Sequence, residues 1–244
     1  MKEILGKYLK SRPLFLALIR AKEAWLFQKY LPLTPPILDL GCGDGFFAKI
    51  AFRKLNIGLD LKDSRIREST KEAMYEKLME YDGHKIPLRS GSVSTVVSNC
   101  VLEHIPNLEE VVEEVYRILK PGGLFITTVM AKPWEDNLMF GGWYKNWMRR
   151  KQVHFNLLNY WEWMKLWKNC GFEVREKIGY LSPTACKLID FCHYVSLPSL
   201  ISYKLTGRWD WGWRWYPTER FAKIMNENVE ADKSGAIFFE LRKK

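Results

Sequence analysis

A short apolar run that leads directly into three glycines constrains the fold of this chain more than any other feature. The run is Ile37–Leu40, and glycines follow at positions 41, 43 and 45. Glycine permits a tight turn with positive φ, and it lets the backbone approach a bound molecule without a Cβ in between. The pattern is typical of a buried strand that ends in a ligand-binding turn before a helix.

Strand and helix patterns alternate along the chain around this turn. Short runs rich in Val, Ile, Leu and Phe predict buried strands, and apolar residues at helical spacing predict amphipathic helices. The predicted strands cover 37–40, 56–61, 94–100 and 123–130, and the predicted helices cover 14–30, 46–54, 63–80 and 108–119. This alternation favours an α/β fold in which right-handed helical crossovers join parallel strands.

Polar residues stand where these strands end. Asp60 ends the second predicted strand, 19 residues after Gly41, where a carboxylate can accept both ribose hydroxyls of an adenosine. Asp82 and Gly83 come before the next strand, and Asn99 lies at the end of that strand. Because the carboxyl ends of parallel strands share one edge of a sheet, we expect these residues to meet the glycine turn in one binding crevice.

Several motifs occur in a fixed order between residues 36 and 130. They are DLGCGDG, GLDL, YDGHKIPLRSGSVSTVVSNCVLEHI and VVEEVYRILKPGGLFIT. Together they resemble the class I S-adenosylmethionine-dependent methyltransferases, in the subgroup often called type 11, and CGFEV (170–174) is similar to the family's sixth strand. The resemblance implies S-adenosyl-L-methionine as cofactor. It also implies an α/β fold with a doubly wound, seven-stranded, mostly parallel sheet of the Rossmann-like kind and an antiparallel last strand.

The resemblance also implies which residues bind the cofactor. In this family the glycine turn packs against the methionine moiety, Asp60 binds the ribose hydroxyls, and Asp82 with Gly83 lies beside the adenine. Asn99 and Cys100 line the methionine side, with Cys100 acting mostly through its backbone. The full set of expected cofactor-binding residues is Asp39, Gly41, Cys42, Gly43, Gly45, Asp60, Leu61, Asp82, Gly83, Asn99 and Cys100.

Two other functions stay open from the residues alone. A glycine turn can also bind a nicotinamide cofactor, but the spacing here is G-x-G-x-G rather than the G-x-G-x-x-G of dinucleotide sites. Tyr116 and Lys120 form a Y-x-x-x-K pattern that resembles the dyad of short-chain reductases, and we interpret them as residues that flank the Pro121 turn. The alternatives are therefore a nicotinamide-dependent reductase, or a non-catalytic protein that binds adenosylmethionine or associates with a membrane.

Methyl transfer itself needs few catalytic residues. A sulfonium methyl group is already activated, so an enzyme mainly has to align the nucleophile and exclude water. A hydroxyl acceptor benefits from a base, and the candidates are His154 in QVHFN and His104 after the fourth strand. A plain structural role is the alternative for each histidine. We expect transfer to a small-molecule, sugar or lipid-linked acceptor, at oxygen.

Charge and cysteine content limit the partners. The net charge of +10 suits nucleic acid, anionic small molecules or lipid head groups equally. The chain lacks both the N-P-P-Y type of tetrad, which resembles the signature of amino-methylating nucleic-acid enzymes, and a Pro-Cys pair for cytosine C5 chemistry. We therefore do not expect a nucleic-acid substrate. Five widely spaced cysteines without a Cys-x-x-Cys pair predict neither disulfides nor a metal site, and they favour a cytoplasmic location.

We expect one methyltransferase domain over residues 1–244. Residues 1–35 form an N-terminal helical segment, 36–181 with 235–244 form the core, and 182–234 form a Trp-rich insertion that acts as a lid. In the WDWGWRWYP run of this insertion, four Trp recur at every second position, which fits either a core stripe or the wall of an acceptor site. Aromatic residues with interleaved Arg also suit a membrane surface, so peripheral contact with the inner membrane face is a further interpretation of 182–234.

Overall fold

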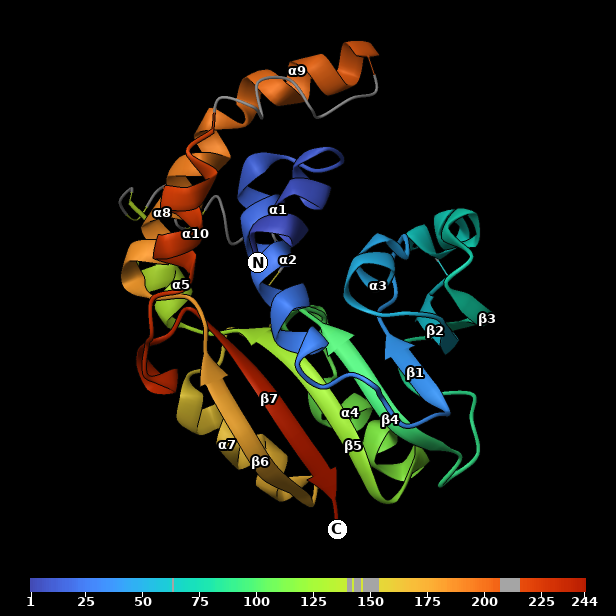
Figure 1. Ribbon diagram of the computed structural model, residues 1–244. Helices are drawn as coiled ribbons and strands as arrows, with labels where there is room; N and C mark the ends of the chain where they lie inside the picture. The colour runs from blue at the N-terminus through green and yellow to red at the C-terminus, as the bar shows by residue number, and fades with distance from the viewer. Residues whose placement is uncertain (63, 140–141, 143–145, 147–153, 207–215) are drawn as a thin grey trace.

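One seven-stranded sheet forms the centre of the molecule, with the strand order β3-β2-β1-β4-β5-β7-β6 (Figure 1). The computed structural model describes residues 1–62, 64–139, 142, 146, 154–206 and 216–244. The strands are β1 (Ile37–Leu40), β2 (Leu55–Leu61), β3 (Tyr75–Tyr81), β4 (Val93–Asn99), β5 (Leu119–Met130), β6 (Phe172–Gly179) and β7 (Ala236–Lys243).

The strand pairing places the glycine turn at the middle of the sheet. β1 lies between β2 and β4 and is parallel to both, so that Leu38 pairs with Ile57 on one side and Val96 on the other. β7 runs antiparallel to β5 and to β6. These pairings confirm the predicted α/β, doubly wound and mostly parallel sheet with an antiparallel last strand. The chain reverses its crossover direction after β3, and ligands bind at such switch points in open α/β sheets.

Helices cover both faces of the sheet (Figure 1). On one face, α1 (Lys2–Leu9), α2 (Leu14–Gln28), α3 (Phe46–Ala51) and α8 (Pro183–Val195) share a hydrophobic core with the strands. On the other face, α4 (Leu108–Ile118) and α7 (Tyr160–Asn169) build a second core, in which Trp163 and Trp167 are fully buried. β1 is buried along its whole length between these two cores, and a strand buried on both faces reads as a continuous apolar run.

The helix predicted over 63–80 is wrong in its second half. The chain forms a short 3₁₀ segment, η1 (Arg65–Glu72), and then the edge strand β3, which pairs in parallel with β2. Three of the seven residues of β3 are charged and none is buried, so the segment lacks the apolar pattern of a buried strand. Gly58 of β2 leaves room for the side chains of β3. A Cβ at this position would lie 2.8 Å from the Leu78 side chain and 3.0 Å from the Tyr75 ring. Pairing with β2 thus outweighs the local preference for helix.

Residues 182–234 connect β6 to β7, and within this segment α8 and Met225 pack into the core. The other elements of the segment are α9 (Leu197–Thr206), α10 (Thr218–Met225) and η4 (Ala231–Lys233). Ala185, Cys186 and Ile189 of α8 are buried against the N-terminal helices, whereas Ile201 and Leu205 of α9 are 63% and 80% exposed. The four Trp of WDWGWRWYP lie outside the described residues.

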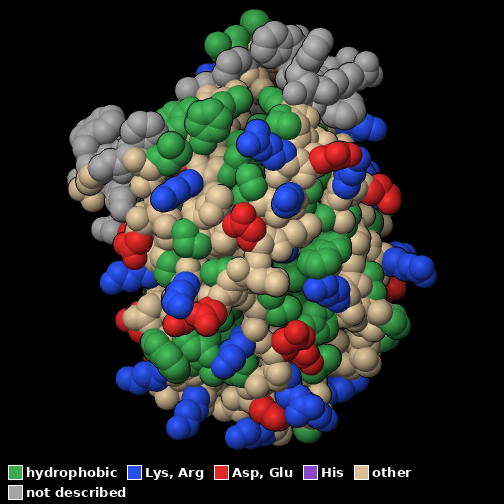
Figure 2. All heavy atoms as spheres, turned by 60° about the vertical axis from the view of Figure 1, so that its left-hand side comes forward, with side chains coloured by type: hydrophobic (Ala, Val, Ile, Leu, Met, Phe, Trp, Pro, Cys, Tyr) green, Lys and Arg blue, Asp and Glu red, His purple; other side chains and the backbone are tan. Residues whose placement is uncertain are grey.

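Hydrophobic side chains gather toward the end of the molecule where α9 lies, on the face drawn in Figure 2, while Lys and Arg side chains are spread over the rest of that face. Within the described part of the chain, no helix combines the length and the apolar character needed to cross a bilayer.

Candidate functional site

The glycine turn after β1 has the conformation that its sequence predicts. Gly41, Gly43 and Gly45 have φ of +76°, +53° and +76°, a region that side-chain-bearing residues rarely adopt. A Cβ on Gly41 would lie 2.3 Å from Cγ2 of Val101, so only glycine fits there. A Cβ on Gly43 would meet nothing within 4 Å. Gly43 therefore faces open space, and Gly45 begins helix α3 as its N-cap.

One carboxylate, Asp60, holds this turn in place, and a second, Asp39, lies buried near the end of β1. Asp60 accepts a hydrogen bond from the backbone N–H of Gly43 at Oδ2 (2.6 Å) and one from the N–H of Leu61 at Oδ1 (2.7 Å). Each carboxylate oxygen has a second lone pair, so Asp60 can still accept hydroxyl donors from a ligand. Asp39 is buried and accepts a hydrogen bond from the Tyr75 hydroxyl (2.5 Å). Burial raises the pKa of Asp39 to about 7, which makes it a structural group beneath the turn rather than an exposed anion.

Asp82 and Gly83 follow β3 at the same edge of the sheet. Asp82 accepts hydrogen bonds at Oδ1 from the N–H groups of His84 (2.9 Å) and Lys85 (3.1 Å), and these bonds lower its pKa. Gly83 has φ of +87°, and a Cβ there would lie 3.2 Å from Cδ2 of Leu61. The structure thus brings this loop beside Leu61, whose side chain is 47% exposed at the end of β2.

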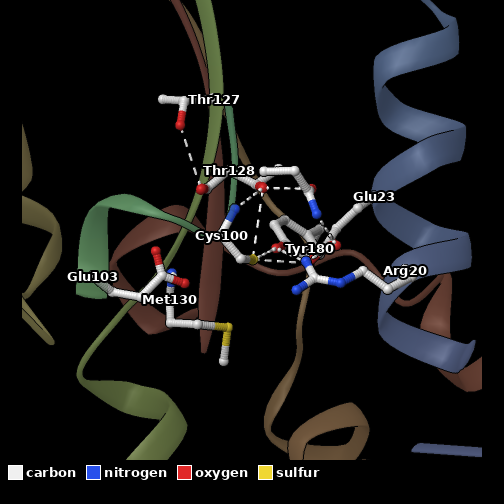
Figure 3. A network of polar contacts seen from close by, with 9 residues as sticks. Arg20, Glu23, Cys100, Glu103, Thr127, Thr128, Met130 and Tyr180 are labelled. Atoms are coloured by element: carbon white, nitrogen blue, oxygen red, sulfur yellow. Dashed lines mark hydrogen bonds and ion pairs between the residues drawn. The ribbon is translucent and has the colours of Figure 1, made fainter. Parts of the chain in front are cut away.

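A buried polar network joins the end of β4 to the N-terminal helices (Figure 3). Its centre is Glu23 of α2, which is fully buried and accepts hydrogen bonds from Asn99 Nδ2 (2.9 Å), the Tyr180 hydroxyl (2.9 Å) and Cys100 Sγ (3.0 Å). Arg20, one helical turn earlier, forms an ion pair with Glu23 (2.7 Å). Neither Glu23 nor Arg20 is predicted from the sequence as a site residue. The only signal there is a group of three charged residues, Arg20, Lys22 and Glu23, within a mostly apolar helix.

The backbone of Cys100 has an unusual conformation, and its thiol stays protonated. Its φ of +50° is unusual for a residue with a side chain, and its N–H donates to both the carbonyl oxygen (3.0 Å) and Oγ1 (3.1 Å) of Thr128. Burial raises the pKa of the Cys100 thiol well above its ordinary value, so the sulfur stays protonated and is a poor nucleophile.

A cavity of about 240 Å³ opens at the glycine turn, between the sheet edge and the N-terminal helices. The predicted cofactor residues Asp39, Gly41, Cys42, Gly43 and Asn99 line it. The N-terminal helices supply Tyr8, Arg12, Leu16 and Arg20, and Arg12 is ion-paired with Asp44 beside the ring of Phe46. Gly45, Asp60, Leu61, Asp82 and Gly83 lie around the turn but are not among the lining residues of this cavity.

A second cavity, of about 190 Å³, adjoins the first one, because Leu16 and Arg20 line both. Its other lining residues are Phe15, Ile19, Cys100, Glu103, His104, Met130, Trp134, His154, Ile189, Asp190 and His193. The rings of His104 and His154, both predicted as catalytic, lie 4.8 Å apart. Burial lowers the pKa of His154 to about 4, so its imidazole is neutral at pH 7 and can accept a hydrogen bond.

The residues at the first cavity fit S-adenosylmethionine. Gly43 leaves open the space that a side chain would fill, and the glycine turn presents backbone to that space. Asp60 offers a carboxylate with unused lone pairs at the end of the neighbouring strand, as ribose hydroxyls require. The glycine turn, Asp60 and Asn99 would hold the cofactor there.

Replacing Gly43 by valine is expected to abolish binding of S-adenosylhomocysteine while leaving the protein folded. The branched side chain would enter the open space at the turn, and a positive φ would cost a residue with a Cβ about 1–2 kcal/mol. Titration calorimetry and a thermal melt measure the two effects. Gly91→Val is a matched control, since Gly91 has φ of +61° and equally open space in a turn away from both cavities. Equal loss of binding in both variants would contradict the placement of the cofactor.

Tyr116 and Lys120 lie away from both cavities. The Tyr116 ring packs edge-on against Phe172 at 5.1 Å, and Lys120 donates to the hydroxyl of Ser94 (3.2 Å). Phe172 begins β6 and Lys120 lies near the start of β5, so the pair sits at the amino edge of the sheet, opposite the glycine turn. The Y-x-x-x-K pattern is therefore not part of the site, as its flanking position in the sequence indicated.

The proteins that resemble this chain in sequence are methyltransferases. The profile of the family described as "Methyltransferase domain" matches residues 38–127. A probable S-adenosylmethionine-dependent methyltransferase of Mycolicibacterium smegmatis is 27% identical over 169 residues, which are 66% of this chain and 61% of that protein. A tRNA (carboxymethyluridine(34)-5-O)-methyltransferase of Arabidopsis thaliana is 28% identical over 48% of this chain and 29% of that protein.

The fold comparison covers nearly the whole chain. The crystal structure of an S-adenosylmethionine-dependent methyltransferase from Thermotoga maritima matches with a TM-score of 0.64 and 16% identity, over 98% of this chain and 94% of that chain. In contrast, the chain spans less than two thirds of the length of the two sequence relatives. The matched motifs, the sheet topology and the glycine-turn cavity agree with one another, and on these grounds the chain carries the domain and fold of the class I S-adenosylmethionine-dependent methyltransferases.

Proposed function

We propose that this protein transfers a methyl group from S-adenosylmethionine to oxygen on a small-molecule, sugar or lipid-linked acceptor. The observation that carries the proposal is the second cavity, which adjoins the cofactor cavity through Leu16 and Arg20. Seven of its thirteen lining residues are apolar and six carry polar or charged side chains. Sites for small organic ligands likewise combine apolar walls with polar groups that fix the orientation of the ligand.

The chain's own residues have simple tasks in this reaction. When bound, S-adenosylmethionine supplies a methyl group on a sulfonium, which is already activated toward a nucleophile. Phe15, Ile19 and Trp134 would hold the apolar part of the acceptor and exclude water. His104 and His154 would contact its reacting group, and the neutral His154 ring can accept a hydrogen bond from a hydroxyl. Alignment of the acceptor by these groups accounts for most of the expected rate enhancement.

Labelled-methyl transfer tests the proposal. The protein is incubated with methyl-labelled S-adenosylmethionine and with lipid, glycan, protein, RNA and small-molecule fractions of a cell extract. We expect label in the small-molecule, glycan or lipid fraction. Label in RNA would instead support a nucleic-acid acceptor, an alternative suggested by the tRNA methyltransferase relative and the net charge of +10. No label in any fraction would favour a non-catalytic adenosylmethionine-binding protein.

His154→Ala is expected to lower kcat about 10²-fold on the labelled acceptor, with unchanged affinity for S-adenosylhomocysteine. The loss arises because the imidazole no longer aligns the acceptor with the methyl group. His84→Ala is the control, since His84 lies on the surface beside Glu110, outside both cavities. A loss below threefold would give His154 a structural role.

We further propose a cytoplasmic protein in which 182–234 contacts a lipid surface or a lipid-linked acceptor. The exposed apolar side chains of this segment support the proposal, and they are Phe191, Val195, Ile201, Tyr203 and Leu205. Sedimentation with liposomes of anionic lipid tests it. Paired Ile201→Ser and Leu205→Ser substitutions should reduce the bound fraction, because partition of an amphipathic segment depends on its buried apolar area. Binding that is unchanged in this variant would contradict the proposal.

A further inference from the structure

Glu103 is a buried carboxyl group whose hydrogen-bonding capacity is largely unused. It lies in η2 (Leu102–His104), directly after β4, and its side chain is fully buried while lining the second cavity. Oε1 accepts only a long hydrogen bond from the Met130 N–H (3.4 Å), and Oε2 has no partner among the described residues. In Figure 3, Glu103 and Met130 lie on one side of Cys100 and Arg20 lies on the other. A buried polar atom without a partner is rare in proteins, and a donor group of a ligand would satisfy it.

The backbone of Glu103, rather than its side chain, holds the local structure. Its carbonyl oxygen accepts hydrogen bonds from the N–H groups of Phe155 (2.9 Å) and Asn156 (3.0 Å). These bonds fix the loop that carries His154. The carboxyl group is therefore not needed to anchor the loop, and its position against the cavity requires another explanation. Burial raises the pKa of Glu103 to about 7, so the group is partly ionised at neutral pH and can both accept and release a proton there.

The charged groups around Glu103 disfavour an anionic ligand. Arg20, the nearest cation from α2, is already ion-paired with the buried Glu23 (2.7 Å). Burial lowers the pKa of His154 to about 4, and it lowers the pKa of His193 from α8, so both rings are neutral at pH 8. Asp190 of α8, a second carboxylate on the cavity wall, accepts a hydrogen bond from the Met139 N–H (2.9 Å).

We propose that Oε2 of Glu103 accepts a hydrogen bond from a hydroxyl group on the methyl acceptor, so that the site selects neutral hydroxyl compounds over carboxylates. This inference rests on the proposed function. As the acceptor oxygen bonds to the methyl carbon, the proton of its hydroxyl passes to the Glu103 carboxylate. The carbon–sulfur bond breaks with its electron pair on sulfur, which leaves S-adenosylhomocysteine. Glu103 is thereby assigned as a catalytic residue, and the histidines align the acceptor.

Binding of three matched probes tests this assignment. 4-Propylphenol, 4-propylbenzoate and 4-propylbenzylammonium are titrated at pH 8 into the protein saturated with S-adenosylhomocysteine. The wild type should bind the phenol at least tenfold more tightly than the benzoate. Glu103→Gln should reduce that preference below threefold, because the amide lacks the charge and can donate to a carboxylate. Glu109→Gln, an exposed glutamate on α4, is the control and should keep the wild-type preference.

The other outcomes contradict either the role of Glu103, the choice of a hydroxyl acceptor, or the proposed function of the second cavity. Benzoate binding as tight as phenol binding in the wild type, or a preference that survives Glu103→Gln, would overturn the role of Glu103. Tighter binding of the ammonium probe would overturn the choice of a hydroxyl acceptor. If no probe binds while S-adenosylhomocysteine still does, the proposed function of the second cavity fails instead. The wild-type comparison alone decides the assignment if the variant does not fold.

Discussion

Asp60→Ala should weaken the binding of S-adenosylhomocysteine by about 10²–10⁴-fold. Two effects add. The ligand loses hydrogen bonds to an ionised group, each worth about 1.5–3 kcal/mol, and about 1.4 kcal/mol corresponds to a tenfold change in affinity. The turn also loses the carboxylate that accepts the Gly43 N–H (2.6 Å), so the cavity is less well preorganised. Titration calorimetry measures the change.

A ligand variant separates these two effects. The 2′-deoxy analogue of S-adenosylhomocysteine lacks one of the hydroxyls that Asp60 would bind. The wild type should therefore prefer the parent compound, and Asp60→Ala should bind both compounds with similar affinity. If Asp60→Ala still prefers the parent compound as strongly as the wild type does, the carboxylate does not bind the ribose. The assignment of Asp60 would then be wrong even if its role in the turn held.

Glu23→Ala should lower the free energy of unfolding by about 3–5 kcal/mol, the usual cost of removing one partner of a buried ion pair. Glu23 is fully buried, and its loss would leave Arg20, Asn99 and the Tyr180 hydroxyl without their acceptor. For a chain of this size each kcal/mol lowers the melting temperature by about 2–4 °C. A thermal melt should therefore show a fall of about 6–20 °C.

The control for this prediction is Glu110→Ala. Glu110 pairs with His84 on the surface, where ion pairs contribute little, and its melting temperature should stay close to that of the wild type. Glu23→Gln keeps the size of the side chain and one acceptor oxygen, so we expect an intermediate melting temperature. A Glu23→Ala protein that melts within 2 °C of the wild type would show that the network does not anchor α2.

The sequence predicted the parts of the site whose chemistry is local. Gly41, Gly43 and Asp60 are read correctly as a turn and a strand-end carboxylate, because the conformational need for glycine and the position of a strand end both show in neighbouring residues. The roles of these residues toward the cofactor stay predictions. The sheet was also predictable, since buried parallel strands form apolar runs.

The parts that the sequence did not predict depend on contacts between distant segments. Glu23 bonds Asn99 and Tyr180, which are 76 and 157 positions away, and no local pattern indicates that pairing. The edge strand β3 has three charged residues among its seven and no buried one, so only its pairing with β2 identifies it. Glu103 falls in the same class, because its burial and its unpartnered Oε2 become visible only when α2, β5 and the His154 loop surround it.

The most direct test of the central claim is a calorimetric titration of the wild-type protein with S-adenosylhomocysteine and, separately, with NADPH. We predict one binding site for S-adenosylhomocysteine per chain and no heat of binding with NADPH, because we assign the glycine turn and Asp60 to an adenosine joined to methionine. Tight binding of NADPH that S-adenosylhomocysteine cannot displace, or no binding of S-adenosylhomocysteine, would contradict this claim.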